Sequence, residues 1–157
     1  MAYLTFKLDN DQFAVDVLKA REVLDLKTIT KVPHSPRFML GVINLRGGVV
    51  PVIDLRLKFG LNNADLTRDS SIIVMEVIVD DDPVIVGTLV DSVEEVLEVE
   101  DQQIEPPPRI GTRLKTEFIQ GMGNTGEQFI IILDIDRVFS AEEITLIQNC
   151  HEEPATA

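Results

Sequence analysis

The sequence contains no tryptophan, one cysteine and two histidines among 157 residues. A lone cysteine, Cys150, has no partner for an intramolecular disulfide, which fits a reducing compartment. His34 and His151 lie far apart in the sequence, so no four-ligand zinc pattern can be assembled. These absences argue against a disulfide-stabilised secreted domain and against a zinc site.

Long apolar runs and basic residues are also scarce. No run approaches the roughly 18 apolar residues that mark a membrane-spanning helix, and the first residues lack the basic-then-apolar order of a signal peptide. The net charge is −13, which argues against nucleic acid and anionic membrane as partners. We therefore expect a cytoplasmic protein without direct membrane insertion, whose 45% apolar residues can bury a core.

The charge is unequal along the chain. Residues 1–69 carry ten Lys and Arg against eight Asp and Glu, whereas residues 70–157 carry four against nineteen. Such a distribution makes the molecule electrically polar and can orient it against charged partners. The alternative, that acidic residues in the second half only confer solubility, stays open.

An internal repeat organises the sequence. The stretch 38–55 recurs in outline eighty residues later, and the run Glu22-Val23-Leu24 recurs as Glu95-Val96-Leu97 at an offset of 73. Two copies of one pattern predict two similar structural units. The identical pairs at the offset of eighty are Phe38 and Phe118, Gly41 and Gly121, Asn44 and Asn124, Asp54 and Asp134, and Phe59 and Phe139.

Each copy contains four or five short apolar stretches, which predicts an all-β protein of two pseudo-symmetric small barrels. We expect a first barrel over 1–69, a second over 70–139, a C-terminal helix over 140–150 and a flexible tail over 151–157. The helix follows from the capping box Ser140-Ala141-Glu142-Glu143. Strands are expected over 3–8, 12–17, 42–45, 49–55, 72–79 and 84–90, with short helices over 37–40 and 55–60.

The sequence shows no catalytic or cofactor-binding constellation, so we expect neither enzymatic activity nor a cofactor or metal. Residues 121–126 fit G-x-G-x-x-G, but a strand follows them where a dinucleotide site requires a helix. They predict a glycine-rich hairpin instead. Asp54 and Asp134 follow apolar strands at equivalent places, which favours helix caps over an acid–base pair. The runs 9–11 and 80–82 are aspartate-rich turns without the glycine and glutamate of a calcium loop.

Arg46 marks the sharpest difference between the copies, because Gly126 occupies the equivalent position. An arginine in a glycine turn presents a planar cation that suits a carboxylate on another protein. An internal salt bridge that ties the two barrels together is the other interpretation. Glu22 has the same two interpretations, as an exposed strand residue or as a partner contact.

The stretch Gly-Val-Ile-Asn-Leu-Arg-Gly-Gly-Val-Val-Pro-Val-Ile-Asp-Leu-Arg at 41–56, preceded by Val32-Pro33 and Glu22-Val23, resembles the CheW family of bacterial chemotaxis coupling proteins. The resemblance extends over residues 3 to about 150. It implies a non-enzymatic adaptor of two SH3-like five-stranded barrels. The family links the cytoplasmic tip of methyl-accepting chemotaxis receptors to the regulatory domain of the histidine kinase CheA.

The resemblance also implies contact residues. The expected receptor-binding residues are Ala20, Glu22, Arg46, Ile72, Val93 and Val96, and the expected kinase-binding residues are Gly41 and Ile110. Two alternatives remain: the coupling module of a larger family member, and a small-ligand-binding double β-barrel.

Overall fold

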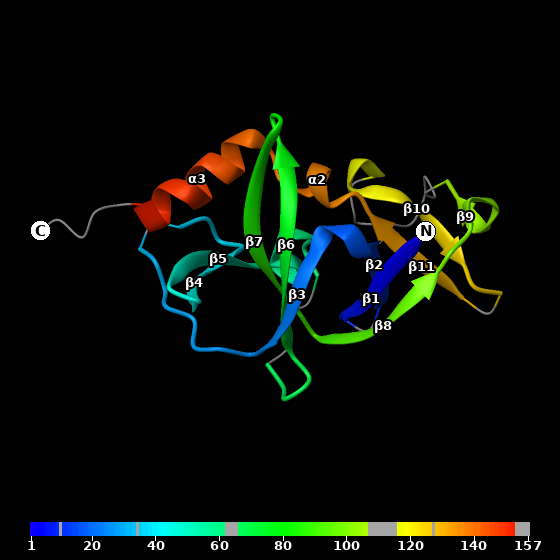
Figure 1. Cartoon of the computed structure of the whole chain (residues 1–157), viewed down its shortest axis with the longest axis horizontal. Coiled ribbons are helices and arrows are strands. Elements are labelled where there is room, and N and C mark those ends of the chain that lie inside the picture. Colours follow the sequence, from blue (N-terminus) through cyan, green and yellow to red (C-terminus); the bar gives the residue numbers. More distant parts are fainter. Residues whose placement is uncertain (10, 34, 62–65, 107–115, 127, 153–157) are drawn as a thin grey trace, which may run out of the picture.

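The computed structural model describes residues 1–9, 11–33, 35–61, 66–106, 116–126 and 128–152, and most of them lie in two β-sheets (Figure 1). In spatial order, the six-stranded sheet A contains β8 (Ser92–Glu98), β1 (Ala2–Leu8), β2 (Asp11–Asp16), β11 (Phe129–Leu133), β10 (Ile119–Asn124) and β9 (Ile104–Glu105). The five-stranded sheet B contains β3 (Ala20–Asp25), β6 (Ser71–Val79), β7 (Asp82–Val90), β5 (Gly48–Asp54) and β4 (Met39–Leu45).

Short helices connect the strands. The 3₁₀ turns are η1 (Val17–Lys19), η2 (Asp101–Gln103) and η3 (Thr116–Phe118), and the α-helices are α1 (Leu55–Lys58), α2 (Ile135–Val138) and α3 (Ala141–Glu152). The predicted mostly β fold, the helical turn after Asp54, the C-terminal helix and the glycine-rich hairpin are confirmed.

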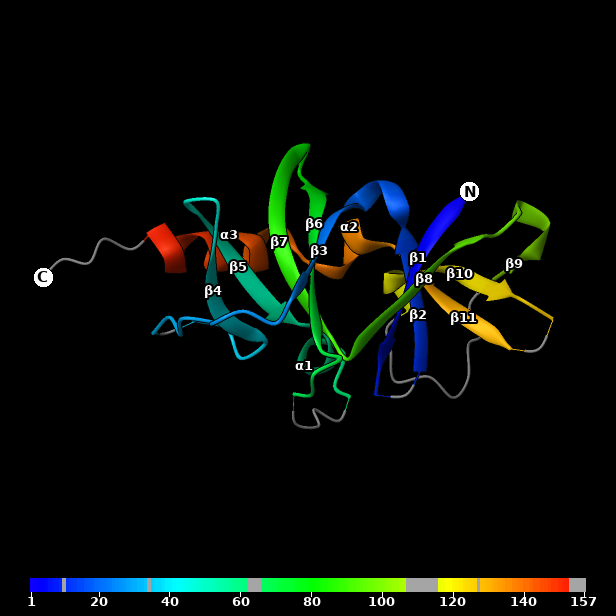
Figure 2. The same cartoon turned by 60° about the horizontal axis from the view of Figure 1, so that its bottom comes forward.

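Each sheet combines strands from both halves of the sequence. The hairpin β1–β2 pairs within sheet A, whose other strands all follow residue 90, and the hairpin β6–β7 pairs within sheet B beside β3, β4 and β5. Sheet B has the strand order β3-β6-β7-β5-β4, and sheet A repeats this order with the equivalent strands β8-β1-β2-β11-β10. The two copies of the repeat have therefore exchanged their first hairpins, as Figure 2 shows for β1 and β6.

This exchange corrects the expected subdomain boundary, because a division between residues 69 and 70 does not separate the sheets. The strand patterns indicate which residues pair in a hairpin, but both sheets offer an equivalent place for each hairpin. The expected helix over 37–40 is also wrong: β4 begins at Met39, and Phe38 accepts a hydrogen bond from Asp54 N at 2.8 Å. Strand pairing here overrides the local capping pattern of Ser35 and Pro36.

The segment that follows β3 reaches β4, at the opposite edge of sheet B. Thr30 and Val42 exchange two backbone hydrogen bonds of 2.8 Å. The glycine at 41 permits this approach, because a Cβ there would lie 2.1 Å from the carbonyl oxygen of Thr30. In sheet A, β9 pairs with β10 in the corresponding way.

Apolar side chains form a core within each sheet and a larger core shared by both. The core of sheet A includes Tyr3 and Ile132, and the core of sheet B includes Ile72 and Val52. The shared core contains a row of rings from Phe6, Phe13, Phe59 and Phe118, whose successive centroids lie 6.2, 6.2 and 5.8 Å apart.

A buried ion network joins the two sheets. Arg56, 2% exposed, bonds Asp54 Oδ2 at 3.0 Å and Asp91 Oδ1 at 2.8 Å. Asp91 Oδ2 in turn accepts the backbone N–H of Asp9, in the β1–β2 turn of sheet A, at 2.7 Å. Burial lowers the pKa of Arg56, but the two carboxylates outweigh it and leave that pKa raised. The predicted helix cap at Asp54 is confirmed, since its Oδ1 accepts the backbone N–H of Arg56 at 2.9 Å.

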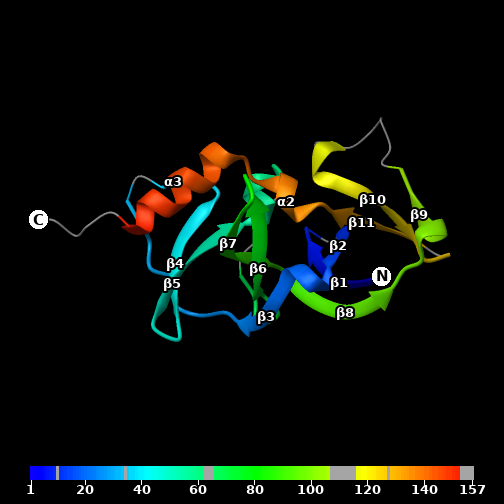
Figure 3. The same cartoon turned by 45° about the horizontal axis from the view of Figure 1, so that its top comes forward.

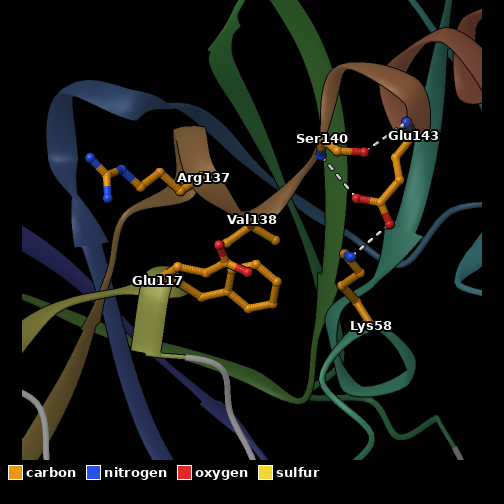
Figure 4. A pocket seen from close by; sticks show the side chains of 7 residues that line it. Lys58, Glu117, Arg137, Val138, Ser140 and Glu143 are labelled. Carbon is orange, nitrogen blue, oxygen red and sulfur yellow. Dashed lines mark hydrogen bonds and ion pairs between the residues drawn. The ribbon is translucent and has the colours of Figure 1, made fainter.

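Helix α3 is fixed at its first turn, where the predicted capping box forms. Ser140 N donates to Glu143 Oε1 at 2.9 Å, and Glu143 N donates to Ser140 Oγ at 3.1 Å. The other carboxylate oxygen accepts from Lys58 Nζ at 2.6 Å (Figure 4). Burial raises the pKa of Glu143, but the hydrogen bonds from Lys58 and Ser140 lower it more, so its pKa lies below the ordinary value.

We predict that Arg56→Met destabilises the protein by about 3 kcal/mol or more, because it leaves two carboxylates without their buried cation. Urea unfolding measures the change. The matched control is Arg137→Met, which removes an exposed pair with Asp134 at 3.4 Å and should cost less than about 1 kcal/mol. Equal losses in the two variants would contradict the structural role of the network.

We predict that Gly41→Ala destabilises the protein by about 2 kcal/mol, because the new methyl group would collide with the carbonyl of Thr30. Gly47→Ala is the control in the same hairpin. Its Cβ would meet no atom within 4 Å, so only the strain of a φ of 84° remains, about 1 kcal/mol. Thermal melts of both variants test the ranking, and a smaller loss for Gly41→Ala would refute it.

The Lys58–Glu143 pair should make stability depend on pH. Because the pKa of Glu143 is lower in the folded state, its carboxylate stabilises the fold above the ordinary value of 4.5, and this contribution disappears as pH falls through the folded-state pKa. The unfolding free-energy difference between wild type and Glu143→Gln should therefore be larger at pH 7 than at pH 3. Glu142→Gln, at the exposed neighbouring position, should show a smaller change. A pH-independent difference for Glu143→Gln would contradict the prediction.

Candidate functional site

One side of the molecule, opposite α2 and α3, is formed by the β4–β5 turn, β3 and β8 (Figure 3). We call it the β3–β8 face. Strands β3 and β8 are equivalent in the repeat and each lies at an edge of its sheet. Among the described residues, β3 pairs with β6 and β8 pairs with β1, and neither has a second neighbouring strand. The outer backbone edge of each strand is thus not paired with any strand that the structure describes.

Arg46 lies at this face, in the two-residue turn between β4 and β5. Arg46 and Gly47 have φ values of 51° and 84°, which suit a tight hairpin turn. The side chain of Asn44 accepts the backbone N–H of Gly47 at 2.9 Å and stabilises the turn. The sequence Asn-Leu-Arg-Gly therefore builds a rigid support for one exposed arginine.

Arg46 and Glu22 form a bidentate ion pair. Arg46 Nη1 and Nη2 donate to the two carboxylate oxygens of Glu22 at 2.7 and 3.0 Å. The hydrogen bonds from Arg46 keep the pKa of Glu22 below its ordinary value. The Arg46 side chain is nevertheless 73% exposed, so it keeps donors for a partner. Both residues belong to sheet B, so the inter-sheet salt bridge considered for Arg46 is made by Arg56 instead.

The equivalent turn of sheet A has no cation. Asn124 accepts the backbone N–H of Gly126 at 2.8 Å, and Thr125 Oγ1 donates to the carbonyl of Gln128 at 3.0 Å. The two turns therefore keep the same asparagine-based support but differ in the charged group that one of them presents.

The other expected receptor-binding residues divide by burial. Ala20 and Val93, equivalent in the repeat, are half-buried against the shared core. Val96 on β8 is 55% exposed, and its counterpart Val23 on β3, absent from the expected set, is 46% exposed. Ile72 is completely buried in the core of sheet B, so it cannot present its side chain to a partner.

The structure gives one expected kinase-binding residue a packing role. Gly41 lies against the backbone of Thr30, and this close contact explains why a residue without a side chain stands there. Ile110 lies outside the described residues.

A half-open cavity of about 560 Å³ lies on the opposite side, lined by Lys58, Glu117, Phe118, Arg137, Val138, Ser140 and Glu143 (Figure 4). The ammonium group of Lys58 in this cavity is already paired with Glu143. Its nitrogen also lies 5.2 and 5.3 Å from the ring centroids of Phe38 and Phe118. Those contacts stabilise the fold, and the small-ligand alternative stays an untested prediction.

The described part of the chain contains no group of three or more His, Cys, Asp or Glu that could hold a metal ion. None of its helices has the length and apolar character needed to cross a membrane.

Besides the hairpin exchange, reasoning from the sequence missed the Arg56 network and the exposure of Val23. The repeat carried a signal for the first, since Arg56 occupies the position equivalent to Asp136, a change of charge as sharp as that at Arg46. Exposure of Val23 had no such signal, because an apolar residue on a strand normally predicts burial.

Comparisons with known proteins agree with this geometry. The profile of the CheW-like domain matches residues 2–143. The chain is 36% identical over 147 residues to the chemotaxis protein CheW of Klebsiella aerogenes, covering 94% of this chain and 86% of the relative. It is also 36% identical over 146 residues to the chemotaxis protein CheW of Thermotoga maritima, covering 91% and 89%.

A solved structure has the same fold. The crystal structure of the scaffolding protein TtCheW from Thermoanaerobacter tengcongensis superposes with a TM-score of 0.79 at 34% identity, covering 90% of this chain and 94% of the other. Because the domain profile, the relatives and the solved structure agree over nearly the whole length, the chain belongs to the CheW family of chemotaxis scaffold proteins.

Proposed function

We propose that this chain is a non-enzymatic adaptor that couples methyl-accepting chemotaxis receptors to the histidine kinase CheA. In this proposal it works in the cytoplasm, at membrane-associated receptor arrays. The receptor tip binds the β3–β8 face, and the regulatory domain of CheA binds elsewhere on the molecule. Family membership supports the adaptor role, and the geometry of the face supports the assignment of the receptor side.

The observation that carries the receptor assignment is the Arg46–Glu22 pair. A guanidinium held by a tight turn and by a bidentate carboxylate is fixed in orientation while it stays 73% exposed. Little side-chain entropy remains to be lost when a partner carboxylate binds it. The receptor tip is a helical hairpin in this family, and its apolar face would pack against Val23 and Val96.

We propose that each sheet is an SH3-like barrel. The bridge from Thr30 to Val42 supports this for sheet B, because it connects the segment after one edge strand to the other edge. The pairing of β9 with β10 supports it for sheet A. An apolar cluster within each sheet is consistent with two small barrel interiors.

A fold shared by the adaptor and the kinase also affects how the two would contact each other. The regulatory domain of CheA has the double-barrel fold in this family, so barrel ends of adaptor and kinase can pair in a head-to-tail manner and close into rings. The segment that contains Ile110 stays our candidate for this contact. Gly41 would act there indirectly, by keeping the Thr30–Val42 bridge in place.

Arg46→Glu tests the receptor assignment. It should abolish co-sedimentation with a recombinant receptor tip, because it places two carboxylates against each other and repels the acidic groups of the partner. Binding to the CheA regulatory domain should persist. Arg68→Glu, the same charge change at an exposed residue of the 66–69 segment, should bind the receptor tip as wild type does.

The double variant Glu22→Arg/Arg46→Glu separates a partner contact from a fold contact. It restores an internal ion pair with the charges exchanged, so its melting temperature should match that of wild type. Receptor binding should stay lost, because a carboxylate now occupies the exposed position. Recovery of binding in the double variant would mean that the pair acts only by supporting the fold.

A further inference from the structure

The edge strand β8 carries the counterpart of the Arg46–Glu22 site, but without its arginine. Glu95 corresponds to Glu22 at the offset of 73, and both lie beside a β-bulge, at Ala20/Glu22 on β3 and opposite Leu4/Phe6 on β8. The backbone of Glu95 is held by Thr5, whose Oγ1 donates to its carbonyl at 2.9 Å and accepts its N–H at 3.1 Å. These two hydrogen bonds fix the backbone of Glu95.

The carboxylate of Glu95 differs from that of Glu22 in having no cation partner within the described part of the chain. The residue is exposed, and no cation among the described residues forms an ion pair with it. Its neighbour Glu94 corresponds to Arg21 of β3, so a negative charge on β8 stands where β3 has a positive one. Residues 91–105 contain seven acidic residues and no Lys or Arg.

Apolar residues flank Glu95 along β8. Val96 is 55% exposed, and Val93 is half-buried at the rim of the shared core. The same combination of an exposed valine and a half-buried small residue occurs on β3 as Val23 and Ala20. The β3–β8 face thus consists of two equivalent halves, of which only the β3 half supplies its own arginine.

We propose that the partner helix supplies the missing cation, an arginine or lysine that pairs with Glu95 on β8. This inference rests on the proposed receptor-binding function and adds an orientation to it. The receptor helix turns an acidic side toward Arg46 and a basic side toward Glu95, with apolar residues between them against Val23 and Val96. The difference in charge between the two halves of the face disfavours the reversed orientation.

A second role for acidic residues on an open strand edge is protection against pairing with other strands. That role depends on the charge of β8 and does not depend on a basic group of the receptor. It predicts that neutralising Glu95 promotes self-association and leaves receptor affinity unchanged. The two roles therefore differ in measurable outcomes.

The test compares Glu95→Gln and Glu95→Arg with wild type in binding to a recombinant receptor tip, measured by fluorescence anisotropy between 50 mM and 500 mM NaCl. Glu95→Gln should weaken binding about tenfold at low salt and reduce the salt dependence, and Glu95→Arg should weaken it further. The matched controls are Glu142→Gln and Glu142→Arg on α3, at the opposite side of the molecule, which should bind as wild type does. Thermal melts and sedimentation verify that each variant is folded and show its oligomeric state.

The outcomes separate this inference from the proposed function. Loss of binding in Arg46→Glu with unchanged binding in both Glu95 variants would overturn the Glu95 contact and leave the receptor assignment intact. Equal weakening in the Glu95 and Glu142 variants would also overturn it, since net charge alone would then explain the effect. Absence of wild-type binding to the receptor tip would overturn both.

Discussion

One buried arginine determines how the two sheets fit together. Arg56 leaves water with 2% of its surface exposed, and two carboxylates from different parts of the chain compensate that cost. Asp54 ends β5 of sheet B, while Asp91 leads into β8 and accepts a backbone hydrogen bond from the β1–β2 turn of sheet A. Any shift of one sheet against the other would separate these charges in a poorly solvated place, so the network favours a single arrangement. The relative position of β3 and β8, and hence the geometry of the face, depends on it.

The exchange of hairpins also holds the two sheets in one arrangement, because it connects them through the chain. Each sheet combines strands from both copies of the repeat, so neither sheet is built from one copy alone. The largest apolar core is shared by both sheets, with four phenylalanine rings in a row through it. A binding surface that spans both sheets is consequently rigid, which reduces the entropy lost when a long helical partner binds across it.

The sequence predicts local structure here far better than long-range pairing. Alternating apolar residues mark β1, short apolar runs mark β6 and β7, and the Ser140–Glu143 capping box marks the start of α3, because those signals depend on near neighbours. The hairpin exchange is not predictable in this way, since equivalent strands of the two copies offer each hairpin equivalent partners. Arg46 stands out as the one charged residue of its turn, whereas the burial of Ile72 follows from the sheet that β6 joins. That choice is made by the tertiary fold.

The exchange also changes where the charge asymmetry lies. Residues 19–90, which contain all of sheet B, carry nine basic and nine acidic residues, whereas residues 1–18 together with 91–140, which contain sheet A, carry five and fourteen. The acidic hairpin β6–β7 thus joins the more basic strands and neutralises that part, while sheet A keeps a strong negative charge. A partner that crosses from β3 to β8 passes from a sheet without net charge, with Arg46 fixed at its β4–β5 turn, to an acidic sheet. Two structurally equivalent halves would otherwise accept a helix in either direction. The difference in charge between them favours one direction over the other.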